Sequence, residues 1–123
     1  MKNLDFLCMQ AAQAMAGVEG KKAAKENLAT KVLGVLLENG PYGAILYLEV
    51  QKNDQRIACA FRDELIALAR SAGVESTLES VGDFEQITKW LQAIANSLDT
   101  YLFVKRLWQQ ALTYARYHAK ACE

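Results

Sequence analysis

The stretch DTYLFVKRLWQQALTYARYHAKAC, residues 99–122, decides the fold of this chain. It contains neither proline nor glycine, and its apolar or small residues recur at steps of three and four, which is the spacing of one side of an α-helix. Asp99 or Thr100 can cap the start of such a helix. At 1.5 Å per residue the helix is roughly 36 Å long. The residues that form its core-facing side are Tyr101, Val104, Trp108, Ala111, Leu112, Ala115, Ala119 and Cys122.

The same helix carries a basic flank beside its apolar side. At about 100° per residue, four cations fall within an arc of roughly 100°. Gln109 and Thr113, rather than acids, lie between them. A stripe of this kind favours contact with phosphate groups. The four cations are Lys105, Arg106, Arg116 and Lys120.

The composition is that of an ordinary globular protein. The chain has 123 residues, of which 52% are hydrophobic and 23% charged, so we expect one helical domain over residues 1–123. Its 14 basic and 14 acidic residues balance, so the chain lacks the high isoelectric point of many nucleic-acid-binding proteins. Any site for an anion must therefore come from local clustering of charge.

Nothing in the sequence predicts contact with a membrane. The start, MKNLDFLCMQAAQAM, has an acid at Asp5, and no apolar run approaches the roughly 18 residues of a membrane span. The three cysteines are odd in number and far apart, which favours free thiols in a reducing compartment. We therefore expect a cytoplasmic protein.

The rest of the chain also reads as helices, which together predict an all-α fold, a compact bundle of about six helices. Asn3 caps the first helix, Asp54 the fourth and Asp83 the fifth. The second helix is apolar almost all round at residues 32–37, so we expect it at the centre of the bundle. The expected helices span residues 4–16, 21–39, 43–50, 54–73, 83–98 and 99–122.

Lys21, Lys22 and Lys25 place positive charge at the start of the second helix, where the helix dipole disfavours it. They form either a solvated first turn or a second phosphate contact. The acids at Glu75, Glu79, Asp83 and Glu85 form either a solvated face or a docking surface for a basic partner.

Signatures of catalysis or of metal binding are weak in this sequence. His118 and Cys122 could form half of a metal site, but no second pair of ligands is visible, so we expect neither a metal nor a cofactor. A cysteine nucleophile would need a neighbouring base, and the sequence nominates none. We therefore expect no catalytic residues. Phe103, Tyr114 and Tyr117 fill the boundary of the core, stack on bases or fill a partner's pocket, whereas Trp90, Trp108, Phe61 and Phe84 are expected in the core.

Two segments, KVLGVLLENGPYGAILYLEV (residues 31–50) and DTYLFVKRLWQQALTYARYHAKA (residues 99–121), resemble the small subunit of the type III-B CRISPR effector, the Cmr complex. The early Ala-rich segment with Met9-Gln10-Ala11 is similar too. The resemblance spans nearly the whole chain and consists mostly of patterned hydrophobic residues. The chain departs from the expected family pattern at Leu33, Tyr114, Tyr117 and His118.

The resemblance implies a non-catalytic structural subunit that contacts the backbone of guide RNA and target RNA. Its partners would be other subunits of a Cmr-type complex, including further copies of itself. The basic residues expected to meet the RNA are Lys105, Arg106, Arg116 and Lys120, with Lys21, Lys22 and Lys25 as a second group. The alternative is a helical protein–protein adaptor, or a self-associating bundle, with no role in RNA binding.

Overall fold

The computed structural model describes residues 3–74 and 83–121, and these form helices without any strand. The predicted all-α fold is therefore confirmed. Within these described residues there are five helices rather than about six, because the expected helix at residues 43–50 continues the preceding one through a kink. The helices are α1 (Leu4–Ala16), α2 (Lys22–Glu49), α3 (Gln55–Ser71), α4 (Phe84–Ala95) and α5 (Leu98–Ala121).

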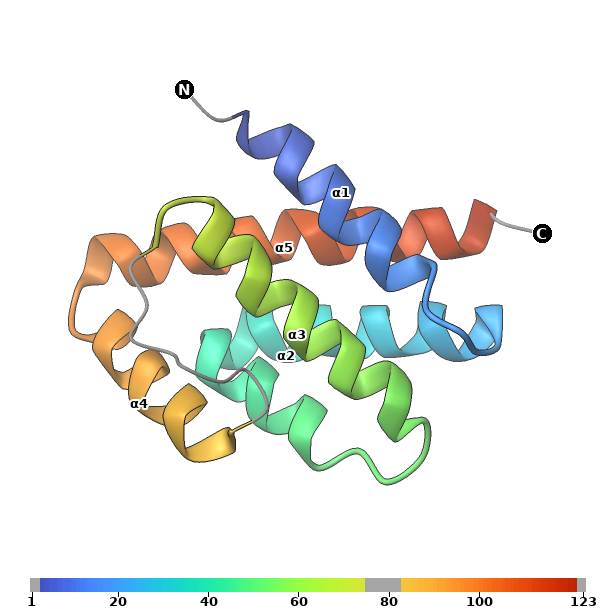
Figure 1. The fold of residues 1–123 in the computed structure, drawn as a ribbon, viewed down its shortest axis with the longest axis horizontal. Coiled ribbons are helices and arrows are strands. Elements are labelled where there is room, and N and C mark those ends of the chain that lie inside the picture. The colour runs from blue at the N-terminus through green and yellow to red at the C-terminus, as the bar shows by residue number, and fades with distance from the viewer. Residues whose placement is uncertain (1–2, 75–82, 122–123) are drawn as a thin grey trace.

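Helix α5 is the element on which the others pack, as its sequence predicts, because it contacts each of the other four helices. The first half of α2 runs beside it, and α1 crosses it on the other side (Figure 1). α3 lies in front of α2 and α5 in the view of Figure 1, and α4 packs near the start of α5. One continuous set of buried apolar residues, drawn from all five helices, fills the space between them.

The kink in α2 lies at Gly40, where the sequence predicts a break at Asn39-Gly40-Pro41. Gly40 has φ 80° and ψ −175°, a conformation that is essentially restricted to glycine. Pro41 then begins the second helical segment, as proline favours the first position of a helix. The change of direction folds the second segment back toward α3 and α4 (Figure 1).

The tryptophans lie at the centre of the core, as predicted. Trp108 is fully buried, and its indole Nε1 donates a hydrogen bond of 2.8 Å to the carbonyl of Leu65 on α3. The ring of Trp90 lies 6.5 Å from the ring of Trp108, at an angle of 45°. Phe61 is buried too. The expectation for Phe84 was wrong, because this residue begins α4 and stays 41% exposed.

The run at residues 32–37 is only partly buried, which corrects the expectation that it is enclosed on all sides. Val32 and Leu36 are completely buried, whereas Leu37 is 47% exposed. Neighbouring helices cover α2 on one side, so the opposite side of this apolar run faces outward.

The helix starts agree with the sequence at two positions and differ at two. Asn3 accepts a hydrogen bond from the Phe6 amide at 3.2 Å, and Asp83 accepts one from the Glu85 amide at 3.0 Å, as predicted. The prediction of Asp99 or Thr100 as a cap was wrong, because α5 begins earlier and the Ser97 hydroxyl accepts from the Thr100 amide. Asp54 is left-handed, with φ 55°, and makes no side-chain capping bond.

An ion pair joins the end of α2 to α3. Arg62, only 9% exposed, places Nη1 2.5 Å from Oε1 of Glu49, and its Nη2 lies 3.0 Å from Oδ1 of Asp63.

None of the helices formed by residues 3–74 and 83–121 combines the length and the hydrophobicity that crossing a bilayer requires.

Candidate RNA-binding surface

The predicted basic flank of α5 divides into two pairs. Arg106 and Lys120 are exposed, whereas Lys105 and Arg116 are half-buried. Lys105 and Arg116 are eleven positions apart, which separates them by about 16 Å along the helix axis. Lys105 and Arg106 therefore lie in the first half of α5, and Arg116 and Lys120 lie in its last turns.

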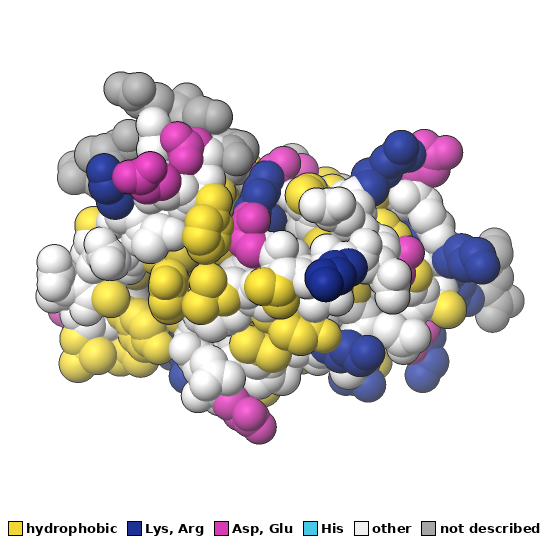
Figure 2. All heavy atoms as spheres, turned by 90° about the horizontal axis from the view of Figure 1, so that it is seen from below, with side chains coloured by type: hydrophobic (Ala, Val, Ile, Leu, Met, Phe, Trp, Pro, Cys, Tyr) yellow, Lys and Arg dark blue, Asp and Glu magenta, His cyan; other side chains and the backbone are white. Residues whose placement is uncertain are grey.

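Lys21 and Lys22 lie at the same end of the molecule as Arg116 and Lys120. The start of α2 and the end of α5 both reach the right-hand end of the fold in Figure 1, because α2 and the long α5 pack side by side in opposite directions. Figure 2 shows Lys and Arg side chains toward that end and hydrophobic side chains over the left and centre of the face. The fold thus brings two separately predicted basic groups to one end, which we call the basic end (Lys21, Lys22, Arg116 and Lys120).

Lys25 has a role inside the fold that the sequence did not reveal. Its Nζ donates hydrogen bonds to the carbonyls of Ala16, at 2.6 Å, and Val18, at 3.0 Å. These carbonyls lie at the C-terminal end of α1, where backbone oxygens lack helical partners. Lys25 therefore holds the end of α1 against the start of α2, and we do not include it in the basic end.

One aromatic residue of α5, Tyr117, lies next to a cation of the basic end. The guanidinium carbon of Arg116 is 5.5 Å from the centre of the Tyr117 ring, a cation–π distance. Tyr117 is 58% exposed, whereas Tyr114 and Phe103 are half-buried. Of the three alternatives for these rings, the boundary of the core accounts for Phe103 and Tyr114 better than for Tyr117.

Tyr114 is fixed by hydrogen bonds between α1 and α5. Its hydroxyl donates to Oδ1 of Asp5 at 2.6 Å, and the Gln110 amide donates to the same oxygen at 2.6 Å. The hydrogen bond to the Asp5 carboxylate raises the pKa of Tyr114 above its ordinary value. The phenol is therefore held as a neutral donor at physiological pH.

An open groove between α1 and α5 adjoins the basic end. Its volume is about 500 Å³. Sequence patterns pointed to Tyr114 and Tyr117 but not to the groove, because the packing of α1 on α5 cannot be read from either helix alone. The residues that line the groove are Met9, Ala12, Gln13, Tyr114, Tyr117 and His118.

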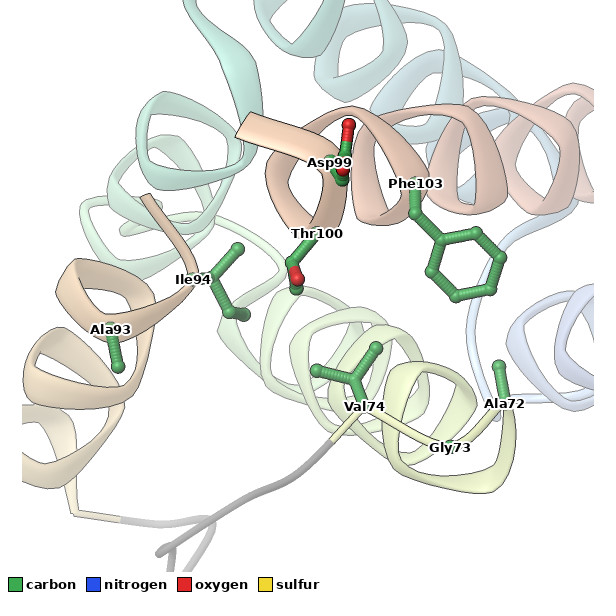
Figure 3. Close-up of a pocket in the computed structure, with 8 residues that line it drawn as sticks. All are labelled: Ala72, Gly73, Val74, Ala93, Ile94, Asp99, Thr100 and Phe103. Atoms are coloured by element: carbon green, nitrogen blue, oxygen red, sulfur yellow. The ribbon is translucent and has the colours of Figure 1, made fainter. Parts of the chain in front are cut away.

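A second hollow, of about 540 Å³, lies at the other end of the bundle, between α3, α4 and α5. Val74 and Phe103 approach it from opposite sides (Figure 3). Asp99 is the only charged residue among those that line it, and Val74 is the last described residue before residues 75–82. This lining offers apolar contact and one carboxylate, so it does not suit an anion.

The described cysteines do not form an evident reactive site. Cys8 and Cys59 are free thiols, as predicted. Burial, with a smaller contribution from the Asp5 charge, raises the pKa of the Cys8 thiol to about 11. The Cys8 Sγ lies 3.6 Å from the carbonyl of Leu107, to which it donates. Cys8 is therefore a protonated, buried thiol at neutral pH, which is a poor nucleophile.

The other candidate groups are only partly within the described residues. His118 is exposed, and Cys122, its proposed partner, lies outside these residues, as do Glu75 and Glu79. Asp83 and Glu85 are exposed. Within residues 3–74 and 83–121, no three His, Cys, Asp or Glu side chains are grouped so as to hold a metal ion.

Comparison of the chain with protein-family models, with curated proteins and with solved structures gives no match.

Proposed function

We propose that this protein is a non-catalytic, RNA-contacting subunit of a type III-B CRISPR effector of the Cmr kind. It would contact the backbone of guide RNA and target RNA and bind neighbouring subunits, further copies of itself among them. The resemblance of residues 31–50 and 99–121 to the small subunit of that complex supports the family assignment.

The observation that carries the RNA-binding part is the basic end. Lys21 and Lys22 are more than ninety positions from Arg116 and Lys120 in the sequence, yet the fold brings both groups to one end of the molecule. Because the net charge of the chain is zero, only a local cluster of basic residues can attract a polyanion such as RNA. The acid in the adjoining loop, Glu19, is engaged by Arg56 at 3.5 Å.

Contacts of this kind recognise phosphates rather than sequence. Lysine and arginine on phosphate oxygens position a protein on the RNA, while base pairing between guide and target supplies the specificity. One copy would neutralise only a few phosphates and would bind weakly. Several copies along one RNA would add their contacts, so that the assembly binds far more tightly than the isolated subunit.

The decisive experiment reverses charge at the basic end. The variant Arg116→Glu/Lys120→Glu is compared with Arg70→Glu/Lys89→Glu, which makes the same charge change at exposed positions of α3 and α4. RNA affinity is measured across a salt series with the isolated subunit, on a double-stranded RNA, and with the reconstituted complex.

We expect the first variant to lower affinity and to flatten the slope of log K against log salt by about 1–2, because one or two phosphate contacts are lost. The control variant should change neither quantity. If both variants leave affinity and salt slope unchanged while the complex still assembles, the basic end does not contact RNA and this proposal fails.

A second candidate function, a helical adaptor without an RNA role, rests on exposed apolar residues of α2 and of the residue that follows it. Leu37 is 47% and Tyr42 45% exposed in α2, Val50 just after it is 67% exposed, and hydrophobic side chains cover the centre of the face in Figure 2. Hydrophobic side chains that gather on an exposed face often mark contact with another protein. Failure of assembly in the Arg116→Glu/Lys120→Glu variant, with RNA affinity of the isolated subunit unchanged, would favour the adaptor.

A further inference from the structure

The groove between α1 and α5 combines aromatic rings, a polar amide and a neighbouring positive charge. Tyr114, Tyr117 and His118 supply three rings, and Met9 supplies a polarisable thioether. Gln13 supplies an amide that can both donate and accept hydrogen bonds. None of the six residues that line the groove is acidic. An opening of about 500 Å³ falls within the range of clefts that take small ligands.

We propose that this groove is a binding site for a single unpaired nucleobase of RNA whose phosphate lies at the basic end. The inference rests on the proposed RNA-binding function and deepens it: the basic end would bind the RNA backbone, and the groove would bind one base that is not paired. No sequence-specific readout is implied, because stacking accepts any base.

The two tyrosine rings are suited to stacking because each is held by a neighbouring side chain. Tyr114 is held by its 2.6 Å hydrogen bond to Asp5, so it forms a fixed wall of the groove. Tyr117 is 58% exposed and has the guanidinium of Arg116 at 5.5 Å from its ring centre. A ring held by a cation offers a base an ordered surface, and the cation itself favours an anionic ligand nearby.

The positions of the cations match the needs of a nucleotide. Lys120 follows Tyr117 by three positions and Arg116 by four, so the three side chains are neighbours on the surface of α5. His118 and Tyr114 are four positions apart and face the groove beside them. A base in the groove would therefore keep its own phosphate within reach of Arg116 and Lys120. This charge next to the groove favours a nucleotide over an uncharged apolar ligand.

His118 provides a direct reporter, because it is the only histidine in the chain. The full-length protein is titrated at one fixed pH with adenosine, AMP and ribose 5-phosphate, and the imidazole C–H resonances are followed by NMR. We expect adenosine and AMP to shift these resonances upfield by ring current, with AMP binding up to about fivefold more tightly because of its phosphate. Ribose 5-phosphate should not produce the upfield shift.

A matched pair of variants tests the same site with RNA. Tyr117→Leu removes a ring from the groove but keeps an apolar side chain, and Tyr42→Leu does the same at an exposed position of α2. We expect Tyr117→Leu to weaken binding of single-stranded RNA by about 5- to 100-fold, the usual loss for one stacked base, and to leave double-stranded RNA unaffected. Tyr42→Leu should alter neither.

The failures of this site and of the basic end are distinguishable. If Tyr117→Leu weakens single- and double-stranded RNA equally, Tyr117 acts only through Arg116 and the base site is overturned. The site is also overturned if adenosine leaves His118 unshifted while Arg116→Glu/Lys120→Glu still weakens double-stranded RNA. Shifts of His118 that follow protein concentration instead of nucleotide would assign the groove to contact between copies of the chain. By contrast, if only the proposal for the basic end is wrong, the Arg116→Glu/Lys120→Glu variant will bind RNA with unchanged affinity.

Discussion

The hydroxyl of Tyr101 lies where a β-carbon at residue 40 would have to be: a Cβ built on Gly40 comes within 1.9 Å of the Tyr101 oxygen. The kink in α2 and the start of α5 are thereby fitted to one another. The glycine is required twice, first by its backbone conformation and second by the tyrosine that packs on it.

Gly40→Ala should destabilise the protein, and Gly34→Ala should stabilise it. At Gly40 the substitution meets both a positive φ of 80° and the Tyr101 ring, so we expect a loss of about 2–4 kcal/mol. At Gly34, six positions earlier in the same helix, a Cβ meets nothing within 4 Å, and the gain should be about 0.5–1 kcal/mol. Urea unfolding measures both.

Tyr101→Phe tests how much of this loss comes from the hydroxyl. Added to Gly40→Ala, it removes the oxygen at 1.9 Å but leaves the ring carbon Cζ at 2.9 Å and the strained φ, so it should recover only part of the lost stability. Equal effects of Gly40→Ala and Gly34→Ala would contradict this account of the kink.

Trp108→Ala should cost about 3–5 kcal/mol in unfolding free energy, because it empties a fully buried site at the centre of the core. Trp108→Phe should cost less but still about 1 kcal/mol or more, since it loses the hydrogen bond to the Leu65 carbonyl. Phe6→Ala is the control: Phe6 is 50% exposed, and its loss should change stability by less than about 0.5 kcal/mol. Similar costs for Trp108→Ala and Phe6→Ala would exclude Trp108 from the core.

How far the sequence predicts this fold depends on whether the deciding interaction is local. The apolar spacing of residues 99–121, the break at Gly40 and the caps at Asn3 and Asp83 are set within a few residues, and the structure agrees with each. The exposure of Leu37 and of Phe84 depends on how the helices pack against one another, so it could not be predicted from the sequence. Asp54 is a suitable capping residue, but the loop before α3 places it in a left-handed conformation.

The candidate site divides in the same way. Helical spacing predicts that Arg116 and Lys120 share a flank, but only the antiparallel packing of α2 on α5 brings Lys21 and Lys22 to the same end. The groove depends on α1 lying against the last turns of α5, and no pattern in either helix predicts it.

Cys8 should make stability fall at alkaline pH. Its folded-state pKa is raised from 9.0 to about 11, so the folded protein holds the thiol proton more tightly than the unfolded chain does. This contribution is fully present below pH 9 and is lost as the pH rises toward 11. Tyr114, whose pKa is also raised, adds a loss of the same sign.

Urea midpoints between pH 7 and 10.5 measure this slope, and Cys8→Ala isolates the part that belongs to the thiol. The variant should show a shallower decline above pH 9 than the wild-type protein. Alkylation mapped by peptide mass spectrometry should modify the half-buried Cys59 before Cys8. Identical slopes in the two proteins would mean that the Cys8 thiol ionises alike in the folded and unfolded states.

Lys25 and Lys21 should respond in opposite ways to the same substitution. Lys25→Met keeps the aliphatic stem but removes the hydrogen bonds to the Ala16 and Val18 carbonyls, so we expect a loss of about 1–3 kcal/mol in stability. Because its ammonium is engaged with those carbonyls, RNA affinity measured where the variant is folded should change little.

Lys21→Met alters an exposed side chain that caps nothing, so stability should stay within about 0.5 kcal/mol while RNA affinity falls and its salt dependence weakens. Urea unfolding and salt-dependent RNA titration on the two variants give four values that must follow this pattern. If Lys25→Met weakened RNA binding as much as Lys21→Met without a loss of stability, the Lys25 ammonium would have to leave the end of α1 when RNA binds, and the basic end would then include it.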